Sequence, residues 1–491
     1  MNRSSIVRTT LWITLLAFAL PAVLGQPQAP QLPSDEWHLL FLSDQPAGYT
    51  HVRTERHNGG YRVETVQKLV LRRGQATVSI ESHSVLDETA DGAVAAFELE
   101  QKQSELPLLA VGKRQGDTLV ITERTSGSAP QTSRFQLKPG VMGYMKALRT
   151  ARQALKKPGD EVSVRIFVPE FKRDLKQDYV FGPKEEIDVR GRRKALRRIE
   201  VTSMGLTATQ WMDDAFSLQK SVTPMMGLSL VSYRSTQDEV LAQDFSSPPE
   251  IFISTSIPVT RLIPDTAKRA RYRLTVKQES VKEWQAYGLF QTVGQTTKTI
   301  STTELDLEVL KVQVDSDVER PLTDRNFAEY LKSNSYLQSD DEELRRIAAR
   351  VVGSERNAWK SAQKAARWVH RSVREKHLRT VFATAKEVLQ RREGDCTEHA
   401  VLLAAICRAA GIPSRVIAGL VFHNGAFVGH MWTEVYVGTW APIDATRRDP
   451  LAGVGHIGLV SSSLESASMS DLFLSIAQVL GNLTIEVQTL E

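Results

Sequence analysis

The chain has 491 residues, 41% of them hydrophobic and 24% charged, so it is long enough for several folded domains and too apolar to be disordered. It contains two cysteines, Cys396 and Cys407, which excludes a disulfide-rich scaffold and any four-cysteine metal site. The formal net charge of +5 is spread over the whole chain and is too weak to indicate nucleic-acid binding.

The N-terminus carries the pattern of a secretory signal peptide. Arg3 and Arg8 precede an apolar run of 14 residues at 11–24, and small residues follow at its end. A membrane-spanning helix needs about 20 apolar residues, and Pro21 interrupts this run, so an N-terminal anchor is the less favoured alternative. We expect residues 1–25 to be removed, no stable membrane insertion afterwards, and a periplasmic or secreted protein.

The next part of the chain predicts β structure. Residues 26–246 alternate polar and apolar side chains in short runs, which is the pattern of an antiparallel β-rich domain. One helix is expected between Pro139 and Pro158. A Ser- and Pro-containing stretch then indicates a boundary, and strand-like runs within residues 247–334 predict a small β connector domain.

Residues 335–491 change in texture and predict an α+β core. Capping-box patterns that begin at Ser339, Thr384 and Asp395 predict three helix starts, and a 3.6-residue apolar period predicts a further helix near 357–374. The helix that follows Asp395 is apolar almost all round, so we expect it to be buried. Strand-like runs are expected at 415–422, 427–437, 439–445 and 483–490, with a helix at 470–480.

The candidate chemistry lies at the start of that buried helix. Cys396 is at about its first position, where the backbone N–H groups and the helix dipole favour a thiolate. A nucleophilic cysteine also needs a base, and His430 is the candidate, with Asp444 as the residue that orients it. We therefore predict Cys396, His430 and Asp444 as the catalytic residues.

The spacing of His430 and Asp444 can be tested against hairpin geometry. A three-residue turn at 436–438 pairs Val435 with Thr439, and it places His430 directly opposite Asp444 with Cβ atoms about 5 Å apart. A two-residue turn would instead place Asp444 on the wrong face of the hairpin. The glycine at position 438 suits the left-handed residue that ends a three-residue turn, so we predict the first register.

Two observations oppose this interpretation. Glu393, Asp395 and Glu398 surround Cys396, and their negative charge disfavours a thiolate unless a protonated His430 offsets it. A single cysteine at a helix start is also more often a small buried hydrophobe than a nucleophile. The hypothesis therefore depends on the combination of residues and their register.

Four blocks of sequence carry a family resemblance. They are the segments 394–400 (GDCTEHA), 410–415 (AGIPSR), 429–435 (GHMWTEV) and 442–446 (PIDAT). In this order they resemble the transglutaminase-like superfamily, and more narrowly its exported bacterial members with a β-rich N-terminal region. The resemblance implies a papain-like cysteine fold in which Cys396 is the nucleophile, His430 the base and Asp444 the orienting residue.

The same resemblance implies an activity. Members of the superfamily attack a carboxamide or peptide carbonyl and form a thioester, which an amine resolves by crosslinking and water by hydrolysis. Animal members use calcium, but no calcium-loop pattern is present, so we expect no metal and no cofactor. Animal members also use a tryptophan as oxyanion donor; Trp359 could serve, but we expect it to pack in the core and the backbone N–H of Cys396 to take this role.

The remaining candidates have structural interpretations. We expect Cys407 to be plain core and His399 to be structural or solvated, although His399 shares a helical face with Cys396. A zinc site of Cys396, His399 and His430 lacks a supporting CxxC or HExxH pattern. The basic cluster within 190–198 is expected to be a solvated turn, with contact to anionic envelope polymers as the alternative.

The sequence thus predicts an exported α+β enzyme that acts on a protein or peptide amide, with residues 335–491 as its catalytic core. It leaves open hydrolysis against transfer, the substrate and the oligomeric state. The alternative from another class is a catalytically idle binding or scaffold protein of the cell envelope. The distance between the Cys396 sulfur and His430 would distinguish the two.

Overall fold

The computed structural model describes residues 32–491 except 74–75, 103–106, 126–129, 226–227, 251–255, 278–280, 287–288, 375–382, 466–471, 473–475 and 477–478. The expected signal peptide and its apolar run lie outside the described residues. No helix within the described part of the chain is long and apolar enough to cross a membrane. The structure is 19% helix and 50% strand, which confirms the predicted α+β class.

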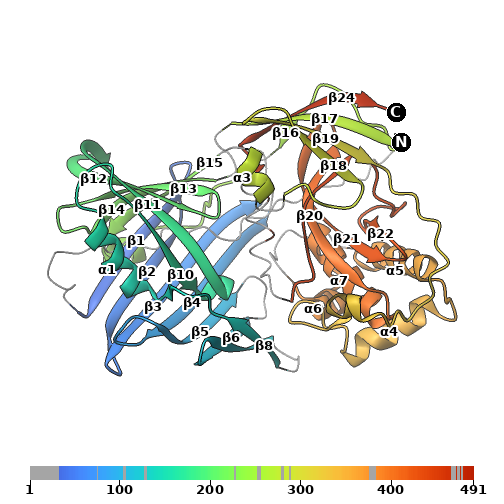
Figure 1. Cartoon of the computed structure of the whole chain (residues 1–491), viewed down its shortest axis with the longest axis horizontal. Coiled ribbons are helices and arrows are strands. Elements are labelled where there is room, and N and C mark those ends of the chain that lie inside the picture. The colour runs from blue at the N-terminus through green and yellow to red at the C-terminus, as the bar shows by residue number, and fades with distance from the viewer. Residues whose placement is uncertain are drawn as a thin grey trace. The chain divides into compact units, whose positions relative to one another are not determined.

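The chain divides into two compact units (Figure 1). One, the N-terminal unit, contains the described residues of 32–72 and 77–250; the other, the C-terminal unit, contains the described residues of 251–491. The expected connector segment 247–334 lies almost wholly within the C-terminal unit. Its division into a domain of its own stays a prediction.

The N-terminal unit is built on one 15-stranded sheet in the order β8-β7-β6-β5-β4-β3-β2-β1-β15-β14-β13-β12-β11-β10-β9. Most neighbouring strands of the sheet are consecutive in the sequence. The exception is β1, which also pairs antiparallel with β15. Its strands are β1 (Ser34–Leu42), β2 (Gln45–His57), β3 (Gly60–Arg73), β4 (Ala76–Glu88), β5 (Val94–Lys102), β6 (Leu108–Gln115), β7 (Thr118–Thr125), β8 (Gln131–Gln136), β9 (Val141–Met142), β10 (Glu161–Val168), β11 (Arg173–Val189), β12 (Arg192–Ser203), β13 (Leu206–Met212), β14 (Leu218–Met225) and β15 (Leu228–Ser235).

One helix, α1 (Tyr144–Ala154), fills the core of this unit, with the short elements η1 (Pro169–Phe171) and α2 (Gln237–Leu241) beside the sheet. The helix lies where the sequence predicted it, and it buries Leu148 and Ala151 in a cluster with Phe97, Phe167 and Phe181. Its first turn has no side-chain cap of its own. Glu88 at the end of β4 supplies one, because its Oε1 accepts a hydrogen bond from the Met145 N–H at 2.8 Å.

The C-terminal unit has two sheets. The five-stranded sheet has the order β16-β21-β20-β23 with β22 on β21, and the four-stranded sheet has the order β18-β19-β17-β24. Because β24 pairs with β17, the end of the chain completes the sheet of the connector segment. The strands are β16 (Ile257–Pro258), β17 (Arg269–Val276), β18 (Gln295–Thr299), β19 (Glu304–Leu310), β20 (Ser414–His423), β21 (Ala426–Tyr436), β22 (Trp440–Ile443), β23 (His456–Ser462) and β24 (Leu483–Leu490).

Helices α4 (Glu342–Val352), α5 (Ala358–Ser372), α6 (Ala385–Arg391) and η3 (Arg325–Leu331) contact α7 (Cys396–Ala409), which also contacts β20 and β21 (Figure 1). Every side chain from Cys396 to Arg408 is buried, as the all-round apolar pattern predicted. A further helix of this unit is α3 (Val281–Ala286).

Two of the three predicted capping boxes are confirmed. Thr384 caps α6 with Glu387, and Asp395 caps α7 with Glu398, each reciprocally. The third prediction is wrong by two residues, because Asp341 rather than Ser339 caps α4. The Asp341 side chain accepts from two first-turn N–H groups, which the serine cannot reach from outside the helix.

Candidate active site

Cys396 lies where the sequence placed it, at the first position of α7. Cys396 is 4% exposed. Asp395, directly before it, caps the helix, and the Asp395 carboxylate accepts a hydrogen bond from the Thr397 N–H at 3.0 Å. Gly394 precedes the cap with φ +143, and a Cβ there would lie 2.3 Å from the Glu398 side chain. A glycine is therefore required for the tight entry into the helix.

One of the acidic residues near Cys396, Glu398, ionises less readily than an ordinary glutamate. Glu398 is fully buried, and its carboxyl group accepts hydrogen bonds from the N–H groups of Asp395 and Ala383 at 2.9 and 3.3 Å. Burial first, and then the neighbouring Asp395, raise the pKa of Glu398 well above its usual value. Glu398 thus holds its proton more tightly than an ordinary glutamate does, and it opposes a thiolate less than an ordinary glutamate would.

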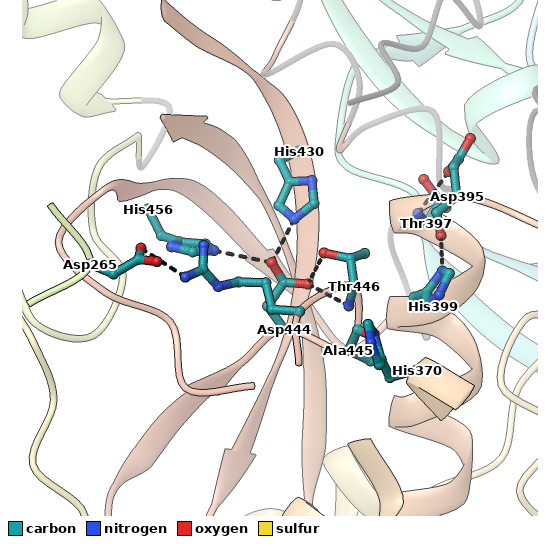
Figure 2. Close-up of polar contacts among 11 residues, drawn as sticks. Asp265, His370, Asp395, Thr397, His399, His430, Asp444, Ala445, Thr446 and His456 are labelled. Carbon is teal, nitrogen blue, oxygen red and sulfur yellow. Dashed lines mark hydrogen bonds and ion pairs between the residues drawn. The ribbon is translucent and has the colours of Figure 1, made fainter. Parts of the chain in front are cut away.

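The structure brings His430 and Asp444 together (Figure 2). His430 Nε2 lies 2.8 Å from Asp444 Oδ2, and the two side chains are 3% and 1% exposed as residues. The other carboxylate oxygen, Oδ1, accepts from the N–H and the hydroxyl of Thr446 at 2.9 and 2.7 Å. Asp444 is thus held in one orientation by its own turn.

The predicted hairpin register is nevertheless wrong. Val435 pairs with Ala441 rather than with Thr439, and the turn residues are 437–439, one position later than expected. This slip moves the partner of each residue by two positions, which preserves the face on which its side chain lies. Asp444, just beyond the end of β22, is therefore a diagonal neighbour of His430 on the same face and still reaches it.

The charge balance of the pair favours an ionised imidazole. Burial alone would lower the pKa of His430, but the charge of Asp444, then Cys396, and the hydrogen bond with Asp444 raise it to about 10. Burial likewise opposes ionisation of Asp444, yet His430 and then His456 hold the pKa of Asp444 well below its usual value. At pH 7 His430 is therefore an imidazolium paired with the Asp444 carboxylate.

The orientation of the ring suits this arrangement. Nε2 is taken by Asp444, so Nδ1 is the nitrogen left for the thiol. Within the described residues Nδ1 is buried and has no hydrogen-bond partner of ordinary geometry. Cys396 is among the groups that raise the pKa of His430.

The sequence missed two residues of this cluster. His456 begins β23, a strand that was not predicted, and its Nε2 lies 3.1 Å from Asp444 Oδ2 (Figure 2). Trp432 stacks 6.1 Å from His430 and meets His456 edge-on at 5.3 Å between ring centroids. Trp432 is visible in the sequence two residues after His430, whereas His456 has no local signal because its strand forms only by pairing with β20.

The other candidate residues lie in structural positions. His399 is buried, and its Nδ1 lies 2.5 Å from the carbonyl oxygen of Asp395, one turn earlier in the chain. Cys407 is fully buried, and burial raises the pKa of its thiol to about 12, as expected of a core cysteine. Trp359 is half-buried in the first turn of α5, so the expectation that it packs in the core is met only in part.

A metal ion could find ligand atoms at His430, Asp444 and His456, which lie within 4.8 Å of one another in the described part of the chain. The two contacts to Asp444 have the lengths of hydrogen bonds, however, and a proton in each gap already satisfies the three groups. The alternative zinc site of Cys396, His399 and His430 stays a sequence hypothesis without a supporting motif. The absence of a cofactor stays an expectation.

Comparison with known proteins finds a family match that spans the candidate residues. Residues 345–445 match the family model of the transglutaminase-like superfamily, so the chain carries a transglutaminase-like region that includes Cys396, His430 and Asp444. No curated protein is significantly similar to the chain.

Three solved structures are similar to parts of the chain. A candidate cysteine protease from Cytophaga hutchinsonii is 18% identical with a TM-score of 0.30, over 46% of this chain and 89% of that one. A beta-barrel-like protein from Brucella abortus is 12% identical with a TM-score of 0.32, over 42% of this chain and 96% of that one. A candidate protease from Parabacteroides distasonis is 12% identical with a TM-score of 0.21, over 74% of this chain and 69% of that one.

Proposed function

We propose that the C-terminal unit is a cysteine-dependent enzyme that transfers or hydrolyses the acyl group of a protein or peptide amide. Cys396 is the nucleophile, His430 the general acid and base, and Asp444 the residue that orients the imidazole. The observation that carries the proposal is the buried His430–Asp444 contact of 2.8 Å, together with the position of Cys396 at the start of α7. The match of residues 345–445 to the superfamily supports the same reaction class.

The proposed reaction has two steps. The Cys396 thiolate attacks the carbonyl carbon, and the protonated His430 gives its proton to the leaving ammonia or amine as the carbon–nitrogen bond breaks. The product is a thioester. In the second step neutral His430 takes a proton from water or from an acceptor amine, which attacks the thioester carbon. The carbon–sulfur bond breaks, the Cys396 thiolate leaves, and the product is the carboxylic acid or the new amide.

Charge on the tetrahedral oxygen also needs a donor. The first-turn N–H groups of α7 point toward the helix start, and the backbone N–H of Cys396 is the proposed donor. Preorganised donors of this kind contribute on the order of 10²- to 10³-fold to acyl transfer. The site thus has the groups that thioester chemistry requires.

A glutamine-containing donor peptide tests the reaction and separates its two forms. The purified protein is incubated with the peptide, with and without a fluorescent primary amine, and ammonia release and amine incorporation are measured. Incorporation indicates a transferase, and ammonia without incorporation a hydrolase. Cys396→Ala must abolish both, with Cys407→Ala as the matched cysteine control. Turnover that survives in Cys396→Ala would reject the proposal. If the wild-type protein turns over no envelope protein, the result would favour the scaffold alternative.

We propose that the protein is exported, because the N-terminal segment has the composition of a signal peptide. N-terminal sequencing of the protein from the source cells tests this. A mature chain that begins near residue 26 in the periplasmic or culture fraction is expected. A cytoplasmic chain that keeps residues 1–25 would contradict it.

A further inference from the structure

His456 lies beside the proposed catalytic pair although nothing in the sequence pointed to it. It begins β23, pairs with Val421 of β20, and is 6% exposed. Its Nε2 lies 3.1 Å from Asp444 Oδ2, the same oxygen that His430 contacts at 2.8 Å. Two imidazoles from different strands therefore share one carboxylate oxygen.

The two imidazoles differ in charge. Burial lowers the pKa of His456, and the positive charges of His430 and Arg447 lower it further against the pull of Asp444. Arg447 is itself paired with Asp265 at 2.8 Å. His456 is therefore neutral at pH 7, and the geometry requires its proton to be on Nε2, because that nitrogen faces the carboxylate oxygen.

With this donor the carboxylate of Asp444 is fully occupied. Oδ1 accepts two hydrogen bonds from Thr446, and Oδ2 accepts one from each histidine. The Thr446 bonds come from the same turn and set the position of Oδ1. The His456 bond comes from a separate strand and is the contact that holds Oδ2 toward His430.

The position of His456 is also held by packing. Its ring meets the Trp432 ring edge-on at 5.3 Å, and Trp432 lies over Gly419, where a Cβ would approach the indole to 2.6 Å. Buried side chains that are locked in this way act as rigid supports for the groups they contact.

We propose that His456 is a positioning residue for the reaction, which donates a hydrogen bond to Asp444 and thereby keeps His430 aligned and protonated beside Cys396. The inference rests on the proposed function of that site. Without the donor, Asp444 is free to turn away from His430, the imidazolium is less stable, and the thiolate is protonated at a higher pH.

Two nearly isosteric variants separate the hydrogen bond from packing. The glutamine of His456→Gln has an amide N–H that can reach the place of Nε2, whereas His456→Met has a similar length and no donor. The readout is the rate of alkylation of Cys396 by iodoacetamide, followed by mass spectrometry of its peptide from pH 5 to 9. Thermal unfolding is measured for both variants as the folding control.

We expect His456→Met to be alkylated roughly tenfold more slowly at pH 7, the factor that loss of one hydrogen bond to a charged group carries. The acid limb of its pH profile should move to higher pH, while His456→Gln keeps the wild-type profile. Wild-type profiles in both variants, or an equal loss in both, would overturn the inference. If His456→Met does not fold, His456→Asn replaces it, because its shorter amide does not reach Asp444 and should reproduce the loss.

The same experiment distinguishes failure of the proposed function. If Cys396 in the wild-type protein reacts no faster than in His430→Ala, the thiol is not activated and the proposed function fails whatever His456 does. If wild-type Cys396 is activated and His456→Met is unchanged, only the role of His456 is rejected.

Discussion

The two units each bury a carboxylate, and the two carboxylates have opposite properties. Glu88 in the N-terminal unit caps α1, and burial raises its pKa to about 7 against the pull of three backbone N–H groups and the charge of Arg149. Asp444 in the C-terminal unit is buried as deeply, but two histidines face it and its pKa is lowered. The comparison teaches that burial raises the pKa of a structural carboxyl group even against several N–H donors, whereas a buried histidine beside a carboxylate lowers its pKa and makes an ion pair.

Removal of the Asp444 carboxylate should have the largest effect. In Asp444→Ala the charge that raises the pKa of His430 is lost, and burial then lowers that pKa. The imidazolium beside Cys396 disappears at pH 7, and we expect the rate of Cys396-dependent turnover to fall by about 10²-fold or more.

Asp444→Asn is the matched variant, because it keeps an acceptor for His430 but not the charge. Its turnover should lie between those of the wild type and Asp444→Ala. Equal turnover in all three proteins, measured with the donor peptide, would show that the carboxylate has no part in the reaction.

Glu88→Gln should remove the pH dependence of stability that the buried Glu88 carboxyl group causes. The folded-state pKa of about 7 lies above the usual value, so the folded state holds the proton more tightly and loses stability as the pH rises from about 4.5 to above 7. The loss amounts to at most roughly 3 kcal/mol.

A neutral glutamine cannot ionise, so Glu88→Gln should be more stable than the wild type at pH 8 and similar to it at pH 5. Urea unfolding of the N-terminal unit at the two pH values measures this. A wild-type protein that is as stable at pH 8 as at pH 5 would show that Glu88 is ionised in the fold.

Gly419→Ala tests the support behind the active pair rather than its charges. An added Cβ would lie 2.3 Å from the carbonyl oxygen of Ile457 and 2.6 Å from the Trp432 ring. Strands β20 and β23 must separate, and we expect a loss of about 1–3 kcal/mol in the free energy of unfolding.

Gly453→Ala is the control for this substitution, since nothing lies within 4 Å of its added Cβ. Both are measured by urea unfolding. An unchanged stability of Gly419→Ala would mean that the sheet can shift at no cost, and that Trp432 and His456 are held less tightly than the packing indicates.

Cys407→Ala should have the smallest effect. The side chain is fully buried in the interior of α7, and its loss should cost about 1 kcal/mol of stability. The rate of alkylation at Cys396 should be unchanged, because Cys407 is a core residue. A change in that rate of more than twofold would show that the two cysteines are coupled through the helix.

The sequence predicted local features well. The capping boxes at Thr384 and Asp395 are complete within four residues, and the all-round apolar pattern of α7 follows from its own side chains. The pairing of His430 with Asp444 was also predictable, although in the wrong register, because a shift of the turn by one residue preserves the face.

Features that depend on contacts distant in the chain were not predictable. β23 is short, follows Gly455 and contains Gly458, and it becomes a strand only by pairing with β20, so His456 was missed with it. The role of Glu88 depends on helix α1, because its hydrogen-bond partner Met145 lies 57 residues later in the chain. No local pattern encodes either contact.

The most direct test of the account is the alkylation of Cys396 by iodoacetamide at pH 7 in the wild-type protein and in His430→Ala. The account predicts rapid labelling of Cys396 in the wild type, little labelling of Cys407, and at least tenfold slower labelling of Cys396 once the imidazolium is removed. Equal rates at Cys396 in the two proteins would contradict the claim that His430 activates this thiol.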